Sequence, residues 1–423
     1  MPAILGCIAD DFTGGTDLAG MLVKAGMRTM QMLGVPRAPL PEDVDAVVIA
    51  LKSRTVPAPQ AIEESLEALR YLQRSGCRQF YFKYCSTFDS TDAGNIGPVT
   101  DALMNALGAD FTIACPAFPE NKRTIFKGYL FVGDELLSES GMRNHPLTPM
   151  TDSNLVRVLQ RQTRRRVGLI DYATVSGGTE AIAACIAALK RDGVGIAIVD
   201  ALSNEDLIRV GTALDGMPLV TAGSGIALGL PQNFRNAGLL GVQTAADTLD
   251  APQGLRAVIS GSCSEATNAQ VAHFIASGGP AFAVDPLALA AGEDVVAQAL
   301  AWAGPLLAAG PPLVYATAAP ASVKAAQGAL GAARAGALVE EALAAIALGL
   351  VELGVRQMLV AGGETSGAVA KALGVEGLRI GPQIDPGVPW TTTLGAPRPL
   401  ALALKSGNFG SVDFFSKAWS VLQ

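Results

Sequence analysis

The stretch ILGCIADDFTGGTD, residues 4–17, decides the fold, because an apolar run of strand length leads straight into two carboxylates, threonines and glycines. A second stretch of the same design, MLVAGGETSG, occupies residues 358–367. In open α/β sheets, ligands bind beyond the carboxyl ends of strands, where both turns are expected. The first turn is acidic. The second is glycine-rich, so a phosphate can approach backbone N–H groups at a helix start. Together the two turns favour phosphoryl transfer between a nucleotide and an acceptor.

The composition predicts a chain with a large buried core. Its 423 residues predict two or three domains, and 50% of them are hydrophobic while 16% are charged. The net charge of −7 argues against a nucleic-acid or membrane-surface partner. The N-terminus lacks the basic and apolar regions of a signal peptide, and six scattered cysteines without a CxxC motif suit a reduced, cytoplasmic protein. A basic run is interpreted as a solvated helix end: Arg161, Arg164, Arg165 and Arg166.

Apolar runs of strand length alternate with helical segments along the chain, which is typical of α/β layers. We predict an α/β fold with two domains, each a mainly parallel sheet flanked by helices. A polar stretch gives a substrate domain over 1–240, a linker over 241–253 and a nucleotide domain over 254–423. The segment 124–138 predicts a β-hairpin inserted in the first domain, with its turn at Gly133-Asp134. The expected strands cover 4–9, 46–51, 79–84, 111–114, 167–170, 195–199, 219–221, 255–260, 281–284, 312–316, 356–361 and 400–404.

Two alanine-rich stretches of the second half predict helices. Residues 287–309 are interrupted by glycine, proline and acidic residues, so they predict two buried helices instead of a membrane span. Residues 316–345 predict a helix with a short linker around 331–336.

Asp10, Asp11 and Asp17 form the first candidate cluster, and Asp10 and Asp11 stand directly after the first predicted strand. A carboxylate there can accept a proton from an attacking hydroxyl or hold Mg²⁺. The alternative is an ordinary helix cap made by Asp11 or Thr13. The doubled aspartate before Thr-Gly-Gly favours chemistry, since the glycines let a ligand approach the backbone. Adjacent residues of a strand end point opposite ways, so the pattern leaves open which aspartate faces the ligand.

Cations and hydroxyls follow two further strands of the same predicted sheet. Arginine offers a two-pronged contact to a carboxylate, and lysine a compact point charge. This combination suits an anionic ligand with several hydroxyls, and ordinary loop polarity is the alternative. The residues predicted to serve this ligand are Ser53, Arg54, Lys83, Ser86, Thr87, Asp89 and Asn95.

A polar loop containing two prolines carries Arg143, Asn144 and His145. Its position after the inserted hairpin predicts a lid or a pocket wall. His145 is expected to contact substrate or to act as an acid, and a solvated loop histidine is the alternative.

Three small-residue turns in the second half predict a nucleotide cradle of backbone N–H groups and hydroxyls. No GxxxxGK[ST] motif occurs, which excludes a P-loop enzyme, and no GxGxxG follows the first strand, which disfavours a Rossmann dehydrogenase. Cys85, Cys115 and Cys263 are expected to be small buried fillers at strand ends. The predicted nucleotide-binding residues are Ser260, Ser262, Ser264, Gly362, Gly363, Glu364, Thr365, Gly407 and Gly410.

These motifs resemble the four-carbon acid sugar kinase family, and the resemblance runs from Gly6 to about Phe415. The branch to which the chain is most similar is the 3-oxo-tetronate 4-kinases. The resemblance is carried by ADDFTGGTD (9–17), FKYCSTFDST (82–91), GNIGPV (94–99), ESGMRNHPLTPM (139–150), SGSCS (260–264) and GGETSG (362–367).

The resemblance implies a first domain that binds a sugar acid and a second that binds ATP with Mg²⁺. The γ-phosphoryl group would move to the terminal hydroxyl of a 3-oxo four-carbon acid. Asp11, with Asp10 as second choice, would orient or deprotonate that hydroxyl. Arg54 and Lys83 would hold the carboxylate or the moving phosphoryl group. The family often has Asp where this chain has Glu364.

Two other functions stay open at this point. One is a kinase of the same family that acts on D-threonate or D-erythronate. The other is a non-enzymatic sugar-acid sensor with the same fold. A small-molecule acid is the expected partner in each case, and a homodimer is the assembly that we leave open.

Overall fold

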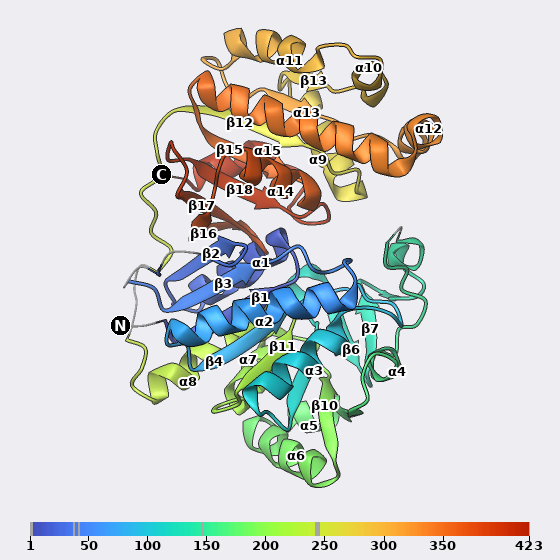
Figure 1. Cartoon of the computed structure of the whole chain (residues 1–423), viewed down its shortest axis with the longest axis vertical. Helices are drawn as coiled ribbons and strands as arrows, with labels where there is room; N and C mark the ends of the chain where they lie inside the picture. Colours follow the sequence, from blue (N-terminus) through green and yellow to red (C-terminus); the bar gives the residue numbers. More distant parts are fainter. Residues whose placement is uncertain (1–2, 37–38, 41–42, 146, 242–245, 423) are drawn as a thin grey trace. The chain divides into compact units, whose positions relative to one another are not determined.

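The computed structural model describes residues 3–36, 39–40, 43–145, 147–241 and 246–422. The chain divides into two compact units, Met1–Asp247 and Thr248–Gln423, which we call unit 1 and unit 2. The division falls within residues 241–253, the stretch interpreted as a linker. In Figure 1, unit 1 runs from blue to yellow-green and unit 2 from yellow to red.

Unit 1 is built on a parallel sheet with the strand order β2-β3-β1-β4-β11-β5-β10-β9. Every paired neighbour in it is parallel, which confirms the predicted fold class. The apolar runs produce this sheet because strands covered on both faces need continuous apolar residues. Strand β2 was not predicted. The bounds are β1 Leu5–Ala9, β2 Thr29–Leu33, β3 Ala46–Ala50, β4 Gln79–Lys83, β5 Thr112–Cys115, β9 Arg166–Ile170, β10 Val194–Val199 and β11 Leu219–Ala222.

Helices α1 and α2 cover opposite faces of this sheet. A Cβ on Gly6 of β1 would lie 3.0 Å from Leu72 of α2, whereas Gly15 of α1 approaches Ala50 of β3. Ala50 pairs in register with Ala9, which points away from the face of Gly6 because side chains alternate along a strand. The helices are α1 Phe12–Lys24, α2 Ala58–Arg74, α3 Ile96–Leu107, α4 Leu155–Gln160, α5 Tyr172–Ser176, α6 Thr179–Arg191, α7 Asn204–Ala213 and α8 Leu230–Asn236, with 3₁₀ turns η1 Pro119–Asn121, η2 Gly141–Asn144 and η3 Gly225–Leu228.

The insertion in unit 1 is a three-stranded antiparallel sheet, β6 Arg123–Phe126, β7 Tyr129–Val132 and β8 Glu135–Leu136. The predicted turn at Gly133-Asp134 joins β7 to β8. A second turn at Lys127-Gly128 joins β6 to β7, and both of its residues have positive φ. The sequence pattern missed this turn because a lysine at positive φ is not a typical turn signal.

Unit 2 is built on the strand order β13-β14-β12-β15-β18-β17-β16. The first five strands pair in parallel, and β17 and β16 add an antiparallel edge. Strands β16 and β17 were not predicted, because Gly381, Pro382 and three consecutive threonines at 391–393 interrupt their apolar residues. The bounds are β12 Leu255–Ser260, β13 Ala281–Ala283, β14 Leu313–Tyr315, β15 Val355–Ala361, β16 Gly377–Asp385, β17 Val388–Leu394 and β18 Ala401–Lys405.

The alanine-rich stretches form helices with some differences from the prediction. The break between α12 and α13 is a single residue, Gly331, with φ 82°, so the linker predicted over 331–336 was too long. Helix α11 buries Val295, Ala299 and Ala303, but α10 buries none of its residues, so only one of the two expected buried helices is buried. The helices are α9 Glu265–Ala276, α10 Pro286–Ala290, α11 Val295–Ala303, α12 Pro320–Leu330, α13 Ala332–Glu352, α14 Gly363–Ala372 and α15 Phe414–Lys417, with 3₁₀ turns η4 Gly304–Leu306 and η5 Ala418–Ser420.

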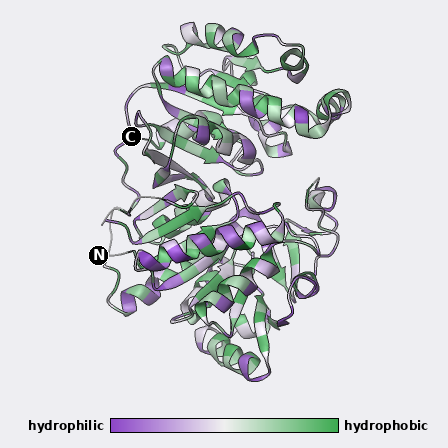
Figure 2. Cartoon of the chain, viewed as in Figure 1, coloured by the Kyte–Doolittle hydropathy of each residue, from purple (hydrophilic) through white to green (hydrophobic). Residues whose placement is uncertain are grey.

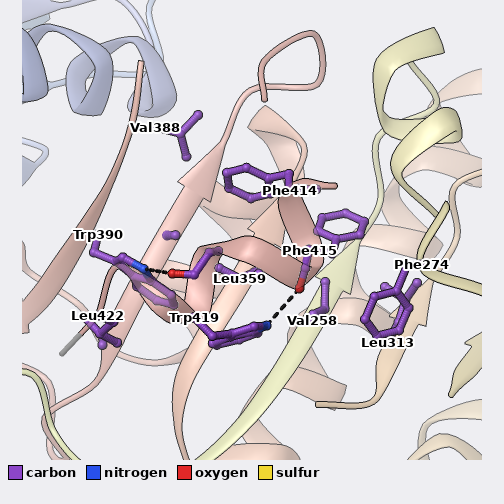
Figure 3. Packing of buried hydrophobic residues seen from close by; sticks show 14 of the residues in the cluster. Val258, Phe274, Leu313, Leu359, Val388, Trp390, Phe414, Phe415, Trp419 and Leu422 are labelled. Carbon is purple, nitrogen blue, oxygen red and sulfur yellow. Dashed lines mark hydrogen bonds between the residues drawn. The ribbon is translucent and has the colours of Figure 1, made fainter. Parts of the chain in front are cut away.

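In the core of unit 2, aromatic side chains from α15 and η5, near the end of the chain, pack against the sheet (Figure 3). The indole N–H of Trp390 donates to the Ala418 carbonyl, and that of Trp419 donates to the Phe415 carbonyl, both at 2.8 Å. In Figure 2, hydrophobic residues (green) are frequent along the strands of unit 1, and hydrophilic residues (purple) are frequent on helices such as α2. In the described parts of the chain, no helix has the length and apolar character needed to cross a membrane.

The cysteines and the basic run differ in part from the predictions. All six cysteines lie in the described part of the chain and are free; Cys115 is buried as expected, but Cys85 and Cys263 are partly exposed. The basic run is not a single helix end, because Arg161 caps α4 whereas Arg166 begins β9.

Candidate active site

The first strand-end cluster lies where the chain of unit 1 changes direction across its sheet. From β1 the chain moves to β2 and β3 on one side and then to β4 on the other. Such a switch point leaves a crevice beyond the carboxyl ends of the strands beside it. Ala9 and Lys83 are paired there, and the Asp10 N–H donates to the Lys83 carbonyl at 3.1 Å. The backbone thus places Asp10, Asp11 and Lys83 at one edge of the sheet.

Arg54 joins the carboxylates of this cluster. Its Nε and Nη2 donate to the two oxygens of Asp10 at 2.9 and 2.8 Å, and Nη2 also donates to Asp11 at 2.6 Å. Its Nη1 lies 3.8 Å from an oxygen of Asp89. The N–H groups of Ser53 and Arg54 both donate to the Asp10 carbonyl, which fixes the loop after β3. Three of the predicted aspartates therefore converge on one guanidinium group.

Asp10 and Asp11 differ in how firmly they hold their negative charge. Burial raises the pKa of Asp10 above its ordinary value, against the opposing effect of Arg54. Burial also acts on Asp11, but nearby cations led by Arg54 outweigh it, and the pKa of Asp11 is lowered. Asp11 caps α1 by accepting from the Gly14 N–H at 3.1 Å and from the Thr13 hydroxyl at 3.0 Å. Asp11 is therefore a firmly ionised carboxylate and a weak base.

Lys83 lies buried beside the start of α1. Its side chain is 4% exposed, and Nζ lies 4.0 Å from Oδ2 of Asp17. A Cβ on Gly14 would lie 2.5 Å from Lys83 Nζ and 2.1 Å from Asp11 Oδ1. Glycine at position 14 therefore leaves the space that both charged groups occupy.

The loop after β4 has a strained backbone and an internal hydrogen bond. Phe88 has φ 53° and is buried, with its ring edge-on to Tyr84 at 5.4 Å. The Thr87 hydroxyl donates to Asp89 at 2.6 Å. Ser86, the residue before Thr87, is also buried. Strain of this kind persists only where the surrounding structure enforces it, and such positions cluster at ligand sites.

Asn95 lies near this cluster, but its side chain serves the backbone. Its Nδ2 donates to the carbonyls of Ser53, Arg54 and Val56 at 2.8, 3.3 and 2.9 Å. This geometry gives Asn95 the task of holding the loop that carries Arg54. A direct contact between Asn95 and a ligand stays a prediction.

The loop with Arg143, Asn144 and His145 stands apart from the cluster in the described contacts. Arg143 and Asn144 are exposed on η2. The Nδ1 atom of His145 accepts from the Thr148 N–H at 3.1 Å. The loop approaches the site through Met150, whose sulfur accepts from the N–H of Ser90 at 3.4 Å. The predicted substrate contacts of these three residues stay predictions.

Two further charged residues lie near this site: Asp17, which the sequence placed in the first candidate cluster without a role, and Arg123, which was not predicted. Asp17 is 3% exposed, and its Oδ2 accepts from the Ser224 hydroxyl at 2.6 Å. Arg123 begins β6; burial lowers its pKa, while the charges of Asp89 and Asp17, among others, oppose that shift. Asp17 stood inside the quoted stretch 4–17, but its contact with Ser224 joins residues 207 positions apart, which no local pattern indicates.

The second strand-end cluster lies at the corresponding switch point of unit 2, between β12 and β15. Ser260 pairs with Ala361, and the N–H groups of Gly261 and Ser262 donate to the Ala361 carbonyl at 2.9 and 3.2 Å. Ser260 is buried and shares a hydrogen bond of 2.7 Å with Thr317. Its hydroxyl therefore holds two strand ends together.

Ser264 and Gly407 link the start of α9 to the loop after β18. The Ser264 hydroxyl caps α9 by accepting from the Thr267 N–H at 3.2 Å and donates to the Gly407 carbonyl at 2.5 Å. A Cβ on Gly407 would lie 2.4 Å from Oγ of Ser262. Ser262 is thus the predicted serine whose hydroxyl, accepting from the Ser264 N–H at 3.3 Å, is least committed to holding the fold.

The glycine-rich turn ends β15 and opens α14. Gly362 has φ 122°, and a Cβ there would lie 3.1 Å from the Ser262 nitrogen. Helix α14 begins without a side-chain cap, and the N–H of Ser366 donates to the Gly362 carbonyl at 2.8 Å. The preceding N–H groups of its first turn can receive an anion. Gly363 and Glu364 are exposed at this turn, while Thr365 is buried.

Lys405 and Gln270 support this cluster and were not predicted. Lys405 is fully buried, and its Nζ donates to the Thr267 hydroxyl at 3.0 Å and to the Gly407 carbonyl at 3.1 Å. Burial lowers the pKa of Lys405 to about 7. Gln270 Nε2 donates to the Gly410 carbonyl at 2.9 Å and so holds the loop after β18. Gly410 allows that loop to turn, since its φ is 85°.

The residues of unit 2 fit the phosphates of a nucleotide better than they fit a metal ion. Bare backbone at Gly362 and Gly407 and the uncapped start of α14 suit a phosphate. Across the described residues, no group of three or more His, Cys, Asp or Glu side chains is placed to hold a metal.

The chain thus consists of two units, each built on a mainly parallel sheet with a polar cluster at its switch point. The profile of the Sugar-binding N-terminal domain matches residues 5–230, and that of the Nucleotide-binding C-terminal domain matches residues 257–415. The chain belongs to the four-carbon acid sugar kinase family, as its motifs indicated.

Full-length relatives support this membership. A protein of Burkholderia multivorans named 3-oxo-tetronate kinase is 63% identical over 419 residues, covering 99% of this chain and 97% of its own length. A Cupriavidus necator protein of the same name is 61% identical, covering 98% and 96%. A crystal structure from Salmonella typhimurium LT2 is 47% identical with a TM-score of 0.87 and covers 98% of both chains. A Haemophilus influenzae structure of the DUF1537 family is 46% identical with a TM-score of 0.78 and covers 99% of this chain and 100% of its own.

Proposed function

We propose that this protein transfers the γ-phosphoryl group of ATP to the terminal hydroxyl of a 3-oxo-tetronate. The observation that carries this proposal is the convergence of Asp10, Asp11 and Asp89 on Arg54, next to Lys83, at the switch point of unit 1. The relatives named 3-oxo-tetronate kinase supply the substrate class.

The acceptor site suits a short sugar acid because it offers both charges. Arg54 Nη1 and Lys83 Nζ can receive the carboxylate of the acid. The oxygens of Asp11 and Asp89 can accept from its hydroxyls. Since Asp10 has both oxygens committed to Arg54, we assign it to holding the guanidinium group in place.

The nucleotide is assigned to unit 2. Its phosphates would be received by the first turn of α14 and by Ser262, with Gly362 and Gly407 leaving the backbone uncovered. Mg²⁺ would accompany the nucleotide and neutralise the charge that develops on the transferring group. Glu364 would contact that ion directly or through water.

Release of ADP over a panel of four-carbon acids tests the proposal. The panel contains both 3-oxo-tetronate epimers, D-threonate and D-erythronate, each with ATP and Mg²⁺. We expect turnover on a 3-oxo acid. Turnover on threonate or erythronate alone would keep the kinase and replace its substrate. Nucleotide binding without turnover on any of the acids would contradict the proposal and favour a sensor.

We infer that the protein works in the cytoplasm, where ATP is abundant and cysteines stay reduced. Six free cysteines suit that compartment. Light scattering of the purified chain decides whether it is the homodimer that we left open.

A further inference from the structure

Asp17 is a buried carboxylate that the proposed function leaves without a task. It lies in the second turn of α1 and is 3% exposed. The Ser224 hydroxyl donates to its Oδ2 at 2.6 Å. Its Oδ1 is buried and has no hydrogen-bond partner in the described part of the chain. A buried carboxylate oxygen without a donor is destabilising, so its retention calls for another purpose.

The nearest cation to Asp17 is Lys83. Nζ lies 4.0 Å from Oδ2, which is an ion pair without a hydrogen bond, and both side chains are 4% exposed. The ammonium also lies against Gly14, one turn before Asp17 in α1, where a Cβ would be 2.5 Å away. The ammonium is therefore placed beside the first two turns of α1.

An ammonium group is unfavourable at this position by itself. The start of a helix carries partial positive charge, and burial disfavours the charged form of lysine. Asp11 already pairs with Arg54 at 2.6 Å and caps α1. Asp17 is thus the carboxylate with which Lys83 forms its ion pair.

We propose that Asp17 is a positioning residue of the acceptor site, which holds the Lys83 ammonium at the start of α1 while Ser224 fixes the carboxylate. This proposal rests on the proposed function, since Lys83 is assigned there to the acceptor.

The proposal has a signature in pH. Burial raises the pKa of Asp17 to about 6, against the lowering effects of Lys83 and the Ser224 hydroxyl. The other charges that face Asp17 are Asp11 of α1 and Glu120 of η1, which raise this pKa. The cation Arg123 of β6 is also close enough to feel Asp17. Below about pH 6 the carboxyl becomes neutral and no longer holds Lys83, so acceptor use is expected to decline there.

Asp17→Asn and Ser224→Ala separate this role from a structural one. For Asp17→Asn we expect kcat/KM for the acceptor to fall about 100-fold, as for a misplaced binding group. The KM for ATP should stay unchanged, and the acid limb near pH 6 should disappear. Ser224→Ala removes a donor that lowers the pKa of Asp17, so its acid limb should move to higher pH.

Asp45→Asn is the matched control. Asp45 is also buried and ion-paired, with Arg28 at 2.9 Å, but it precedes β3 at the opposite edge of the sheet. It should change stability and leave the pH profile as it is. An unchanged acid limb in Asp17→Asn would overturn the proposal, as would an equal loss of ATP affinity. If Asp17→Asn does not fold, an unshifted limb in Ser224→Ala overturns it.

A readout without turnover keeps this test apart from that of the kinase. The Asp17 carboxyl can be titrated by ¹³C NMR in the wild type and in Lys83→Met. The ion pair predicts a higher pKa for Asp17 in the variant, even if no four-carbon acid is phosphorylated. An unchanged titration would overturn the proposal, whereas absence of turnover in the wild type would overturn only the kinase.

Discussion

The guanidinium group of Arg54 contacts Asp10 through two parallel hydrogen bonds of 2.9 and 2.8 Å, from a loop 44 residues away in sequence. Asp10 is 7% exposed at its side chain, so this contact compensates a carboxylate that burial disfavours. The same arginine reaches Asp11 at 2.6 Å. Arg54 therefore both stabilises unit 1 and organises the acceptor cluster.

Replacement of Arg54 by Met should affect stability and activity together. It leaves Asp10 buried without its partner, which should lower the free energy of unfolding by roughly 3 kcal/mol. Acceptor turnover should be lost, while ATP binding by unit 2 is retained. Thermal unfolding and calorimetric ATP titration measure the two effects. Arg54→Lys is the informative companion, because it keeps the charge but not the two-pronged geometry. Full activity in Arg54→Lys would contradict the role that we give to that geometry.

Asp11→Asn should separate charge from capping at the start of α1. Asparagine still accepts from the Gly14 N–H, so stability should change little. The loss of the carboxylate charge that accepts from the acceptor's hydroxyls should reduce kcat/KM for the acceptor by about 100-fold, since the reacting group is oriented less well. ATP affinity should not change.

Asp171→Asn is the matched control for this variant. Asp171 caps α5 by accepting from the Thr174 N–H at 3.0 Å, in the same way as Asp11 caps α1. Steady-state kinetics with both substrates should show normal values for Asp171→Asn. Normal turnover in Asp11→Asn as well would remove Asp11 from the acceptor site.

Much of the acceptor site was predictable because parallel strands bring their carboxyl ends to one edge. This rule alone placed Asp10, Arg54 and Lys83 together before any contact was known. It could not assign their bonds: Asp10 and Asp11 are adjacent, and the structure shows both bound to Arg54. The contact of Asp17 with Ser224 escaped prediction because Ser224 comes from the far end of unit 1.

The fold was predictable where apolar runs are continuous and less so elsewhere. The central parallel strands of both units are such runs. Strands β16 and β17 contain glycine, proline and a run of threonines, so their pattern resembled loops between strands. Lys405 was missed as a site residue because a charge at the end of an apolar strand usually reaches solvent, whereas here it is fully buried.

Gly362→Ala should weaken nucleotide binding selectively. A side chain at φ 122° is strained by about 1–3 kcal/mol. A shift of the turn that relieves about 1.4 kcal/mol of this strain at the expense of the bound geometry would weaken ATP binding about tenfold. Binding of the sugar acid to unit 1 should be unaffected.

Gly328→Ala is the control for this substitution. It lies within α12 with open space around it, where alanine favours the helix. Isothermal titration with ATP should show unchanged affinity for Gly328→Ala. Unchanged affinity for Gly362→Ala would mean that the turn does not receive the phosphates.

Lys405 predicts how the stability of unit 2 depends on pH. Burial lowers its pKa to about 7 in the folded state, whereas the unfolded chain keeps the ordinary value of 10.5. Between these values the unfolded chain binds more protons than the folded one, so stability contributed by this group rises with pH. Below about pH 7 the destabilising effect of the buried charge is fully present.

Comparison of the wild type with Lys405→Met isolates this effect. The stability of the wild type relative to the variant should increase from pH 7 towards pH 10, by at most about 1.4 kcal/mol per pH unit. All three tryptophans, Trp302, Trp390 and Trp419, lie in unit 2, so their fluorescence during denaturant unfolding reports that unit. A difference that is constant over this range would mean that Lys405 keeps its proton when folded. Its hydrogen bonds to Thr267 and Gly407 would then be those of an ammonium group.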